Sequence, residues 1–148
     1  IAIYLGNGNK QVFVNMMNKK AKALGMSGTN FENPCGFDGP NHKSTASDLL
    51  KLTEYSIKNK TFNEIVIKES YSFRAINTKR TYTAHTSNKL LPKEKYMIGV
   101  KTGYTSKAGP CLIARAKDGK KDILLVMLNS QNRWQNTKLA LDTVLNKK

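Results

Sequence analysis

The last third of the sequence constrains the fold most strongly. Residues 96–105, 109–117 and 121–129 form three short runs rich in apolar and β-branched residues. Runs of this length and composition are typical of strands. The Asp118-Gly119 pair between the second and third runs is typical of a tight hairpin. We therefore predict three strands of one antiparallel sheet.

A helix is predicted to follow the sheet, over residues 132–147. Four apolar residues recur there at helical spacing and are expected to face the core. They are Trp134, Leu141, Val144 and Leu145.

Two further helices are predicted before the sheet. The first covers residues 10–24 and ends at Gly25, which suits a left-handed cap. Its expected buried stripe contains Phe13, Met16, Met17 and Leu24. The second covers residues 45–60, where Thr45 and Asp48 resemble a capping box at the first turn.

The segments around the second helix are predicted to be less regular. Residues 27–44 are rich in Gly, Pro, Asn and Asp, which indicates a long loop. Residues 64–76 alternate and predict a strand, while 78–91 predict a short strand and a connection. The whole pattern predicts an α+β (mixed α/β) fold: a helical first half, about 1–95, then a three-stranded antiparallel sheet with a C-terminal helix, about 96–148.

The strong positive charge favours an anionic partner. Lys and Arg number 25 against 10 Asp and Glu, a net charge of +15. Nucleic acid, an anionic membrane face and an anionic cell-wall polymer would all be attracted. We do not expect nucleic acid to be a partner, because the sequence lacks zinc-ligand spacing, a helix-turn-helix pattern and an aromatic RNA-binding signature.

The two cysteines, Cys35 and Cys111, are too few for a disulfide scaffold or a metal site. They could pair outside the cytoplasm, although Cys111 lies in an apolar run and fits a buried free thiol better. We expect no metal and no cofactor.

The first predicted strand contains a Lys-Thr-Gly motif, Lys101-Thr102-Gly103. Serine acyl-transferases combine this motif with Ser-x-x-Lys and Ser-x-Asn earlier in the chain. No serine here has Lys three residues later, and the single Ser-x-Asn, at residues 130–132, follows Lys101. On its own, Lys101 would be interpreted as a charge that blocks aggregation at a sheet edge.

The sequence around the motif changes that interpretation. Residues 98–130, "IGVKTGYTSKAGPCLIARAKDGKKDILLVMLNS", closely resemble the third-motif region of serine-type D-alanyl-D-alanine carboxypeptidases, the low-molecular-mass penicillin-binding proteins. Residues 18–52 resemble the stretch after the second motif of that family, and "SNKLL" at 87–91 resembles the segment before the third motif. The resemblance covers nearly the whole chain and implies part of a penicillin-binding-protein, transpeptidase-like catalytic domain. Two residues depart from the pattern of the family. Cys35 stands where the family usually has His, and Tyr104 stands where several members have His.

The resemblance implies roles for four consecutive residues. Strand alternation is expected to point Lys101 into a cleft, where its charge would face the carboxylate of a peptide substrate. The family implies that Thr102 contacts the same carboxylate. Gly103 would let the substrate backbone approach closely. The backbone N–H of Tyr104 would be one of two oxyanion donors. For Arg133 and Lys89, carboxylate binding is a weaker hypothesis than a solvated surface role.

The implied parent enzyme trims peptidoglycan peptides that end in D-Ala-D-Ala, and it binds β-lactams. It would act on the extracytoplasmic side, in the cell envelope. A different class of function is a non-catalytic cell-wall-binding module with a degenerate cleft.

The residues "IAIYLG" at 1–6 look like the end of a helix that follows the second motif. We therefore expect the chain to begin downstream of the nucleophile and to be inactive alone. The family would then place missing N-terminal strands beside residues 121–129. That apolar edge is expected to need a cover, either the missing portion or a second copy.

Overall fold

The computed structural model describes residues 1–147. Its elements follow the chain in the order α1 (Ala2–Leu5), α2 (Lys10–Ala23), α3 (Ala46–Ser56), α4 (Lys60–Val66), β1 (Ser70–Arg74), β2 (Thr81–His85), β3 (Met97–Thr105), β4 (Gly109–Asp118), β5 (Lys121–Met127) and α5 (Arg133–Leu145). Helix and strand occur together and both sheets are antiparallel, so the predicted fold class is confirmed.

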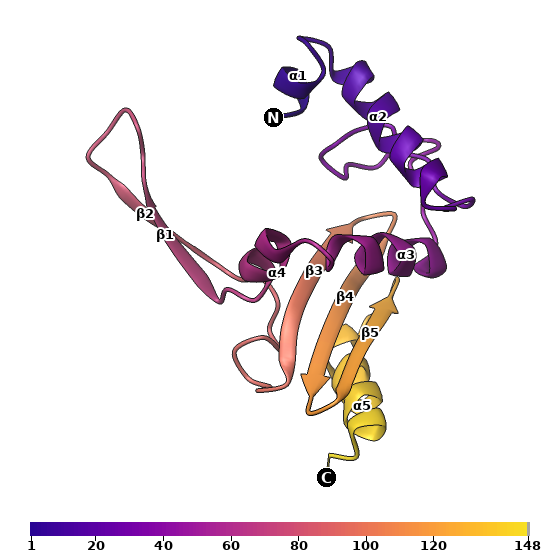
Figure 1. The fold of residues 1–148 in the computed structure, drawn as a ribbon, viewed down its shortest axis with the longest axis vertical. Helices are drawn as coiled ribbons and strands as arrows, with labels where there is room; N and C mark the ends of the chain where they lie inside the picture. Colours follow the sequence, from indigo (N-terminus) through magenta and orange to yellow (C-terminus); the bar gives the residue numbers. More distant parts are fainter. Residues whose placement is uncertain (148) are drawn as a thin grey trace.

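The main sheet has the strand order β3-β4-β5, and β1 and β2 form a separate hairpin. Helices α3 and α4 cross one face of the main sheet, while α5 lies against the other (Figure 1). Helices α1 and α2 lie beyond one end of the sheet. The hairpin projects from the side where β3 forms the sheet edge.

The core lies between the sheet and α5. Alternate residues of β4, Leu112, Ala114 and Ala116, are completely or almost completely buried and share one cluster with Leu141 and Leu145 of α5. Because two of the three β4 residues are alanines, α5 can approach the sheet closely. The turn before β3 closes the cluster with Leu90, Leu91, Tyr96 and Met97.

All three strands predicted in the last third are present, and so is the terminal helix. Asp118 pairs with Lys121, so Gly119 and Lys120 form the predicted hairpin turn, and Gly119 has a φ of 56°. Helix α2 confirms the first predicted helix, and Gly25 after it has a φ of 70°. The Thr45 side chain accepts a hydrogen bond from the Asp48 amide, as expected for the predicted capping box.

The strand predicted over residues 64–76 is wrong in its first part. Residues up to Val66 belong to α4, and the strand begins only at Ser70. The Asn59 side chain accepts a hydrogen bond from the Phe62 amide and starts this helix. Local capping therefore outweighs the β-branched composition of Ile65 and Val66.

Met16 and Val144 were predicted to lie on the buried stripes of their helices, but both are exposed. Met16 is 49% exposed, while Val14 and Ala21 are buried on the inner face of α2. Val144 is 53% exposed, and Thr137 takes a buried position on α5. Apolar spacing alone therefore misplaced one residue on each helix, while Trp134, Leu141 and Leu145 lie in or against the core as predicted.

Gly99 allows α4 to pack directly on β3. Its φ of 139° is one that side chains rarely adopt. A Cβ built there would lie 3.0 Å from Cγ2 of Val66 and 3.4 Å from its carbonyl oxygen. The position next to the Lys-Thr-Gly motif therefore accommodates only glycine without rearrangement.

The strand β5 pairs only with β4, and no strand described in residues 1–147 lies on its other edge. Within the same residues, no helix has both the length and the apolar character needed to cross a membrane.

Candidate functional site

The Lys-Thr-Gly motif lies on the edge strand β3, where Lys101 is exposed and Thr102 is half-buried. Residues 101–104 pair with residues 110–113 of β4, and no strand described in the structure pairs with their other side. Lys101 is exposed, and its ammonium group donates a hydrogen bond to the carbonyl oxygen of Thr102 at 2.6 Å. An exposed, outward-facing lysine at a sheet edge is able to bind an anion that lies along the strand.

Thr102 is held by the segment that follows β2. Its hydroxyl lies 2.6 Å from the hydroxyl of Ser87. The next residue, Asn88, is buried, and its side chain donates to the carbonyl oxygen of Gly99 at 3.5 Å. Ser87 and Asn88 together hold the segment that follows β2 against β3, and Ser87 orients the hydroxyl of Thr102.

Arg133, the first residue of α5, contacts the same strand. One guanidinium nitrogen donates to the carbonyl oxygen of Gly103 at 2.6 Å and to that of Cys111 at 3.0 Å. The guanidinium also lies over the ring of Trp134, 4.5 Å from its centre. Arg133, for which the sequence favoured a solvated surface role over carboxylate binding, is therefore fixed beside the motif. Lys89, the other basic residue considered, is exposed.

Gly103 and Tyr104 leave the strand surface open. A Cβ at Gly103 would meet only Cβ of Cys111, at 3.7 Å, an ordinary contact. Nothing within the described chain thus requires glycine at this position. Tyr104 is 70% exposed, so its ring is available to a ligand.

The long loop of residues 27–44 reaches the far end of β3. Its Asp38 accepts a hydrogen bond from the Thr105 hydroxyl at 2.6 Å. Near it, Asn33 accepts hydrogen bonds from the backbone amides of Cys35, Gly36 and Phe37. The loop is therefore built by its own polar side chains, and Cys35 within it is exposed.

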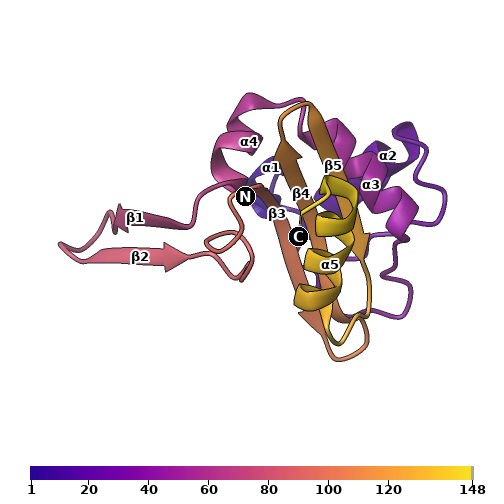
Figure 2. The ribbon, with the colours of Figure 1, turned by 90° about the horizontal axis from the view of Figure 1, so that it is seen from below.

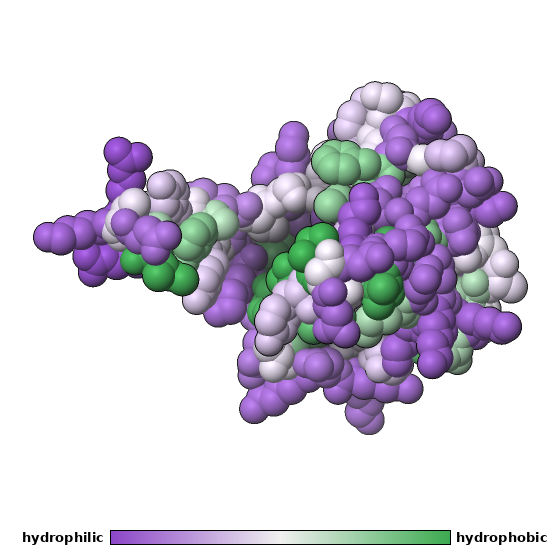
Figure 3. Space-filling model, turned by 90° about the horizontal axis from the view of Figure 1, so that it is seen from above, coloured by the Kyte–Doolittle hydropathy of each residue, from purple (hydrophilic) through white to green (hydrophobic). Residues whose placement is uncertain are grey.

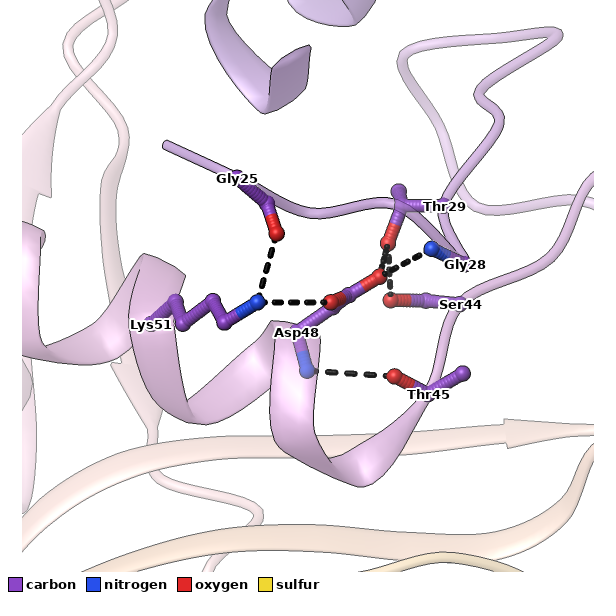
Figure 4. A network of polar contacts seen from close by, with 7 residues as sticks. All are labelled: Gly25, Gly28, Thr29, Ser44, Thr45, Asp48 and Lys51. Carbon is purple, nitrogen blue, oxygen red and sulfur yellow. Dashed lines mark hydrogen bonds and ion pairs between the residues drawn. The ribbon is translucent and has the colours of Figure 1, made fainter. Parts of the chain in front are cut away.

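A buried carboxylate anchors the start of this loop to α3 (Figure 4). Asp48 is 2% exposed and accepts hydrogen bonds from the Gly28 amide and the Thr29 hydroxyl, both at 2.8 Å. Lys51 lies 3.6 Å from the other carboxylate oxygen and donates to the Gly25 carbonyl. One aspartate thus connects the end of α2, the loop and α3.

Burial raises the pKa of the Asp48 carboxyl, but other effects outweigh it. Hydrogen bonds from Thr29 and Gly28, and the charge of Lys51, leave the pKa below its ordinary value of 3.8. Asp48 is therefore ionised at neutral pH and holds the loop as an anion.

These groups can bind an anionic, extended ligand, but they do not form a nucleophile. Among residues 1–147, no serine hydroxyl is hydrogen-bonded to a lysine or histidine side chain; Ser87, for example, pairs with Thr102. A serine nucleophile needs such a base to accept its proton. A cavity of about 600 Å³ lies between α4 and the base of the hairpin, and none of residues 101–104 lines it.

Known proteins share both the sequence and the fold. A family model described as D-alanyl-D-alanine carboxypeptidase matches residues 2–132. The D-alanyl-D-alanine carboxypeptidase DacF of Bacillus subtilis is 33% identical over 124 residues, which cover 84% of this chain and 32% of that protein. The D-alanyl-D-alanine endopeptidase of Escherichia coli is 31% identical over 128 residues, 86% of this chain and 41% of the relative.

Solved structures agree with these relatives. The crystal structure of the Streptomyces K15 DD-transpeptidase matches with a TM-score of 0.87 and 29% identity, over 92% of this chain and 55% of that one. The chain spans 32% and 41% of the length of the two curated relatives above.

Acid should weaken the attachment of the loop through Asp48. Because the pKa in the folded chain is lowered below 3.8, the contribution of Asp48 to stability is complete above about pH 5 and is lost as the pH falls through the folded pKa. An Asp48→Asn variant should melt ~5 °C or more lower at pH 7 and should lose less of its remaining stability towards pH ~2. Thermal unfolding followed by circular dichroism across this pH range measures both effects.

The matched control is Glu54→Gln, on the exposed side of the same helix, which should leave the melting temperature and its acid dependence unchanged. An acid dependence as steep in Asp48→Asn as in the native chain would contradict the assigned role.

Proposed function

The chain belongs to the D-alanyl-D-alanine carboxypeptidase family, and on this basis we propose that it is part of a serine enzyme that removes the terminal D-alanine from peptidoglycan peptides. The proposed reaction forms an acyl-enzyme and then hydrolyses it. The observation that carries the proposal is the Lys101-Thr102-Gly103 row on the outer edge of β3, in which Lys101 and Gly103 are exposed and Thr102 is half-buried, with Arg133 fixed beside it.

We assign binding of the substrate carboxylate to Lys101 and Thr102. A peptide that ends in D-Ala-D-Ala carries a free carboxylate, which an exposed ammonium group and an oriented hydroxyl can bind through charge-assisted hydrogen bonds. Arg133 adds a second cation: one of its terminal nitrogens is used by the Gly103 and Cys111 carbonyls, and a guanidinium has further donors for a carboxylate.

Gly103 and Tyr104 complete the proposed substrate contacts. The absence of a side chain at Gly103 lets an extended peptide lie against the strand as a further, temporary neighbour. The backbone N–H of Tyr104 donates one hydrogen bond to the oxyanion that develops in the transition state. The second donor would be the N–H of the nucleophilic serine.

The nucleophile is proposed to come from a longer protein that carries Ser-x-x-Lys and Ser-x-Asn, since residues 1–148 contain neither motif before Lys101. That complete enzyme would react with β-lactams and would act outside the cytoplasm, at the cell envelope, where its substrate is found. No cofactor is required by this chemistry.

A non-catalytic cell-wall-binding module is the second candidate. It is favoured by one observation, that the residues of 1–147 supply no serine paired with a base while the net charge of the chain is +15. Intact Ser-x-x-Lys and Ser-x-Asn motifs encoded upstream would decide for the enzyme, and degenerate ones for the module.

Lys101→Ala in the complete enzyme should slow acylation by penicillin by about ten- to a hundredfold. One lost charge-assisted contact is worth about 1.5–3 kcal/mol. Stopped-flow measurement of the acylation rate tests this, with Lys107→Ala in the exposed turn after β3 as the matched control. An unchanged rate in a folded Lys101→Ala protein would mean that this lysine only protects the sheet edge.

The isolated 148-residue chain should form no covalent adduct with penicillin, because covalent catalysis needs the serine of Ser-x-x-Lys. Electrospray mass spectrometry after incubation with excess penicillin provides the measurement. A stable mass increase of one ligand on any serine of this chain would refute the expectation.

We also propose that the open edge of β5 is covered by another strand, from the N-terminal portion of a longer protein or from a second copy. An unpaired strand with the apolar residues 123–128 is a template for pairing. Light scattering after size exclusion should therefore show association of the isolated chain that increases with concentration. A stable monomer at high concentration, with slow amide exchange along β5, would contradict this expectation.

A further inference from the structure

The β1–β2 hairpin extends away from the body of the molecule, and none of its strand residues is buried. Both views of the ribbon show it projecting beyond the main sheet and the helices (Figures 1 and 2). Every residue of β1 and β2 is exposed. Two five-residue strands reach about 17 Å, so the tip of the hairpin can touch a surface that the body does not.

One face of this hairpin is aromatic. Phe73 pairs with Tyr82 and Tyr71 pairs with Ala84, so alternation places all four on the same face. The rings of Phe73 and Tyr82 stack, with centres 5.8 Å apart. Tyr71, Phe73 and Tyr82 are nevertheless 59%, 47% and 46% exposed. Hydrophobic and hydrophilic residues lie side by side along the projection in the space-filling view (Figure 3).

The tip combines a free apolar side chain with cations. Ile76, in the loop between the strands, is fully exposed. Arg74, Lys79 and Arg80 flank it, and residues 70–85 contain no acidic residue. The nearest acids in the sequence, Glu64 and Glu69, lie at the base, where the hairpin leaves α4. Charge is thus graded along the hairpin, from mixed at the base to purely positive at the tip.

We propose that this hairpin is a membrane-surface anchor that binds anionic phospholipid head groups, with Ile76 inserted among the acyl chains. Cations near an anionic leaflet are each attracted to it, and a nearby apolar side chain gains by leaving water. Tyrosine suits the boundary between head groups and acyl chains, because its ring can be buried while its hydroxyl stays hydrated, and the ring of Phe73 adds apolar surface beside it. An anionic glycan would attract the same cations, but it would give no reason for a fully exposed isoleucine at the tip.

The proposal does not depend on the proposed catalytic function. If both hold, the hairpin would place β3 close to the membrane, because Ser87, two residues beyond β2, is hydrogen-bonded to Thr102.

Vesicle co-sedimentation of the 148-residue chain tests the proposal. The probes are vesicles of phosphatidylcholine alone and of phosphatidylcholine with phosphatidylglycerol, and binding is expected only to the second. Ile76→Ser should weaken partitioning about tenfold, since it removes the inserted side chain. Lys79→Gln should weaken it about fivefold.

Matched controls separate the hairpin from the general positive charge of the chain. Leu139→Ser removes an apolar side chain that is 69% exposed on α5, and Lys120→Gln removes an exposed cation in the turn before β5. Each should change partitioning by less than about twofold, because neither lies on the hairpin. Circular dichroism of each variant establishes that the fold is retained.

A second readout reports insertion directly. Tryptophan at position 76, introduced as Ile76→Trp, should shift its emission to the blue on vesicle binding and be quenched by acyl-chain-brominated lipid. Leu139→Trp should show neither effect. Equal losses for Lys79→Gln and Lys120→Gln without quenching at position 76 would overturn the proposal in favour of non-specific adsorption. Self-association that Ile76→Ser abolishes, without any vesicle binding, would overturn it in favour of a second copy.

Discussion

The central strand β4 is the constraint on which the other elements depend. Its one face, Leu112, Ala114 and Ala116, receives α5. From its other face, Arg115 makes a bidentate contact with Asp122 of β5, at 2.8 and 2.6 Å, and donates to the side chain of Asn63 in α4 at 2.7 Å. Arg115 lowers the pKa of Asp122, although partial burial opposes it. Arg115 therefore links β4 to both β5 and α4. Removing either partner of the ion pair would leave the charge of the other uncompensated.

The position of β4 also explains why the Lys-Thr-Gly row is available. Since β4 satisfies the inner edge of β3, the outer edge of β3 faces outwards along residues 101–104. This part of β3 is held by contacts from distant parts of the chain: Ser87 at Thr102, within the row, and Asp38 at Thr105, beyond it. Arg133 adds a third support at Gly103. A strand fixed in this way can receive a peptide without reorganising, which is the condition for positioning it well.

The sequence predicted the parts of the fold that depend on local pattern. Runs of apolar and β-branched residues predicted β3, β4 and β5, and the Asp118-Gly119 pair predicted the hairpin between β4 and β5, because strand composition and turn chemistry are local properties. The sequence-based prediction was wrong at α4, where the cap at Asn59 outweighed β-branched residues. It was also wrong for Met16 and Val144, because tertiary packing decides which residues at the margin of an apolar stripe are buried. The Lys-Thr-Gly row was found as a motif, and Arg133 only as the weaker of two hypotheses. Asp38 and Ser87 could not be found, since each reaches β3 from a distant segment.

The electrostatics of the site follow from how the few acidic residues are used. Among residues 1–147, six of the ten form ion pairs with Lys or Arg: Asp48, Glu64, Glu94, Asp118, Asp122 and Asp142. Among the described residues, none of these pairs includes Lys101 or Arg133, whose hydrogen bonds go to backbone carbonyls. Carbonyls orient both cations without neutralising them. A carboxylate approaching β3 would therefore meet two fixed positive charges, neither of which is paired with a carboxylate of the described residues. The remaining surplus of Lys and Arg would attract it from a distance.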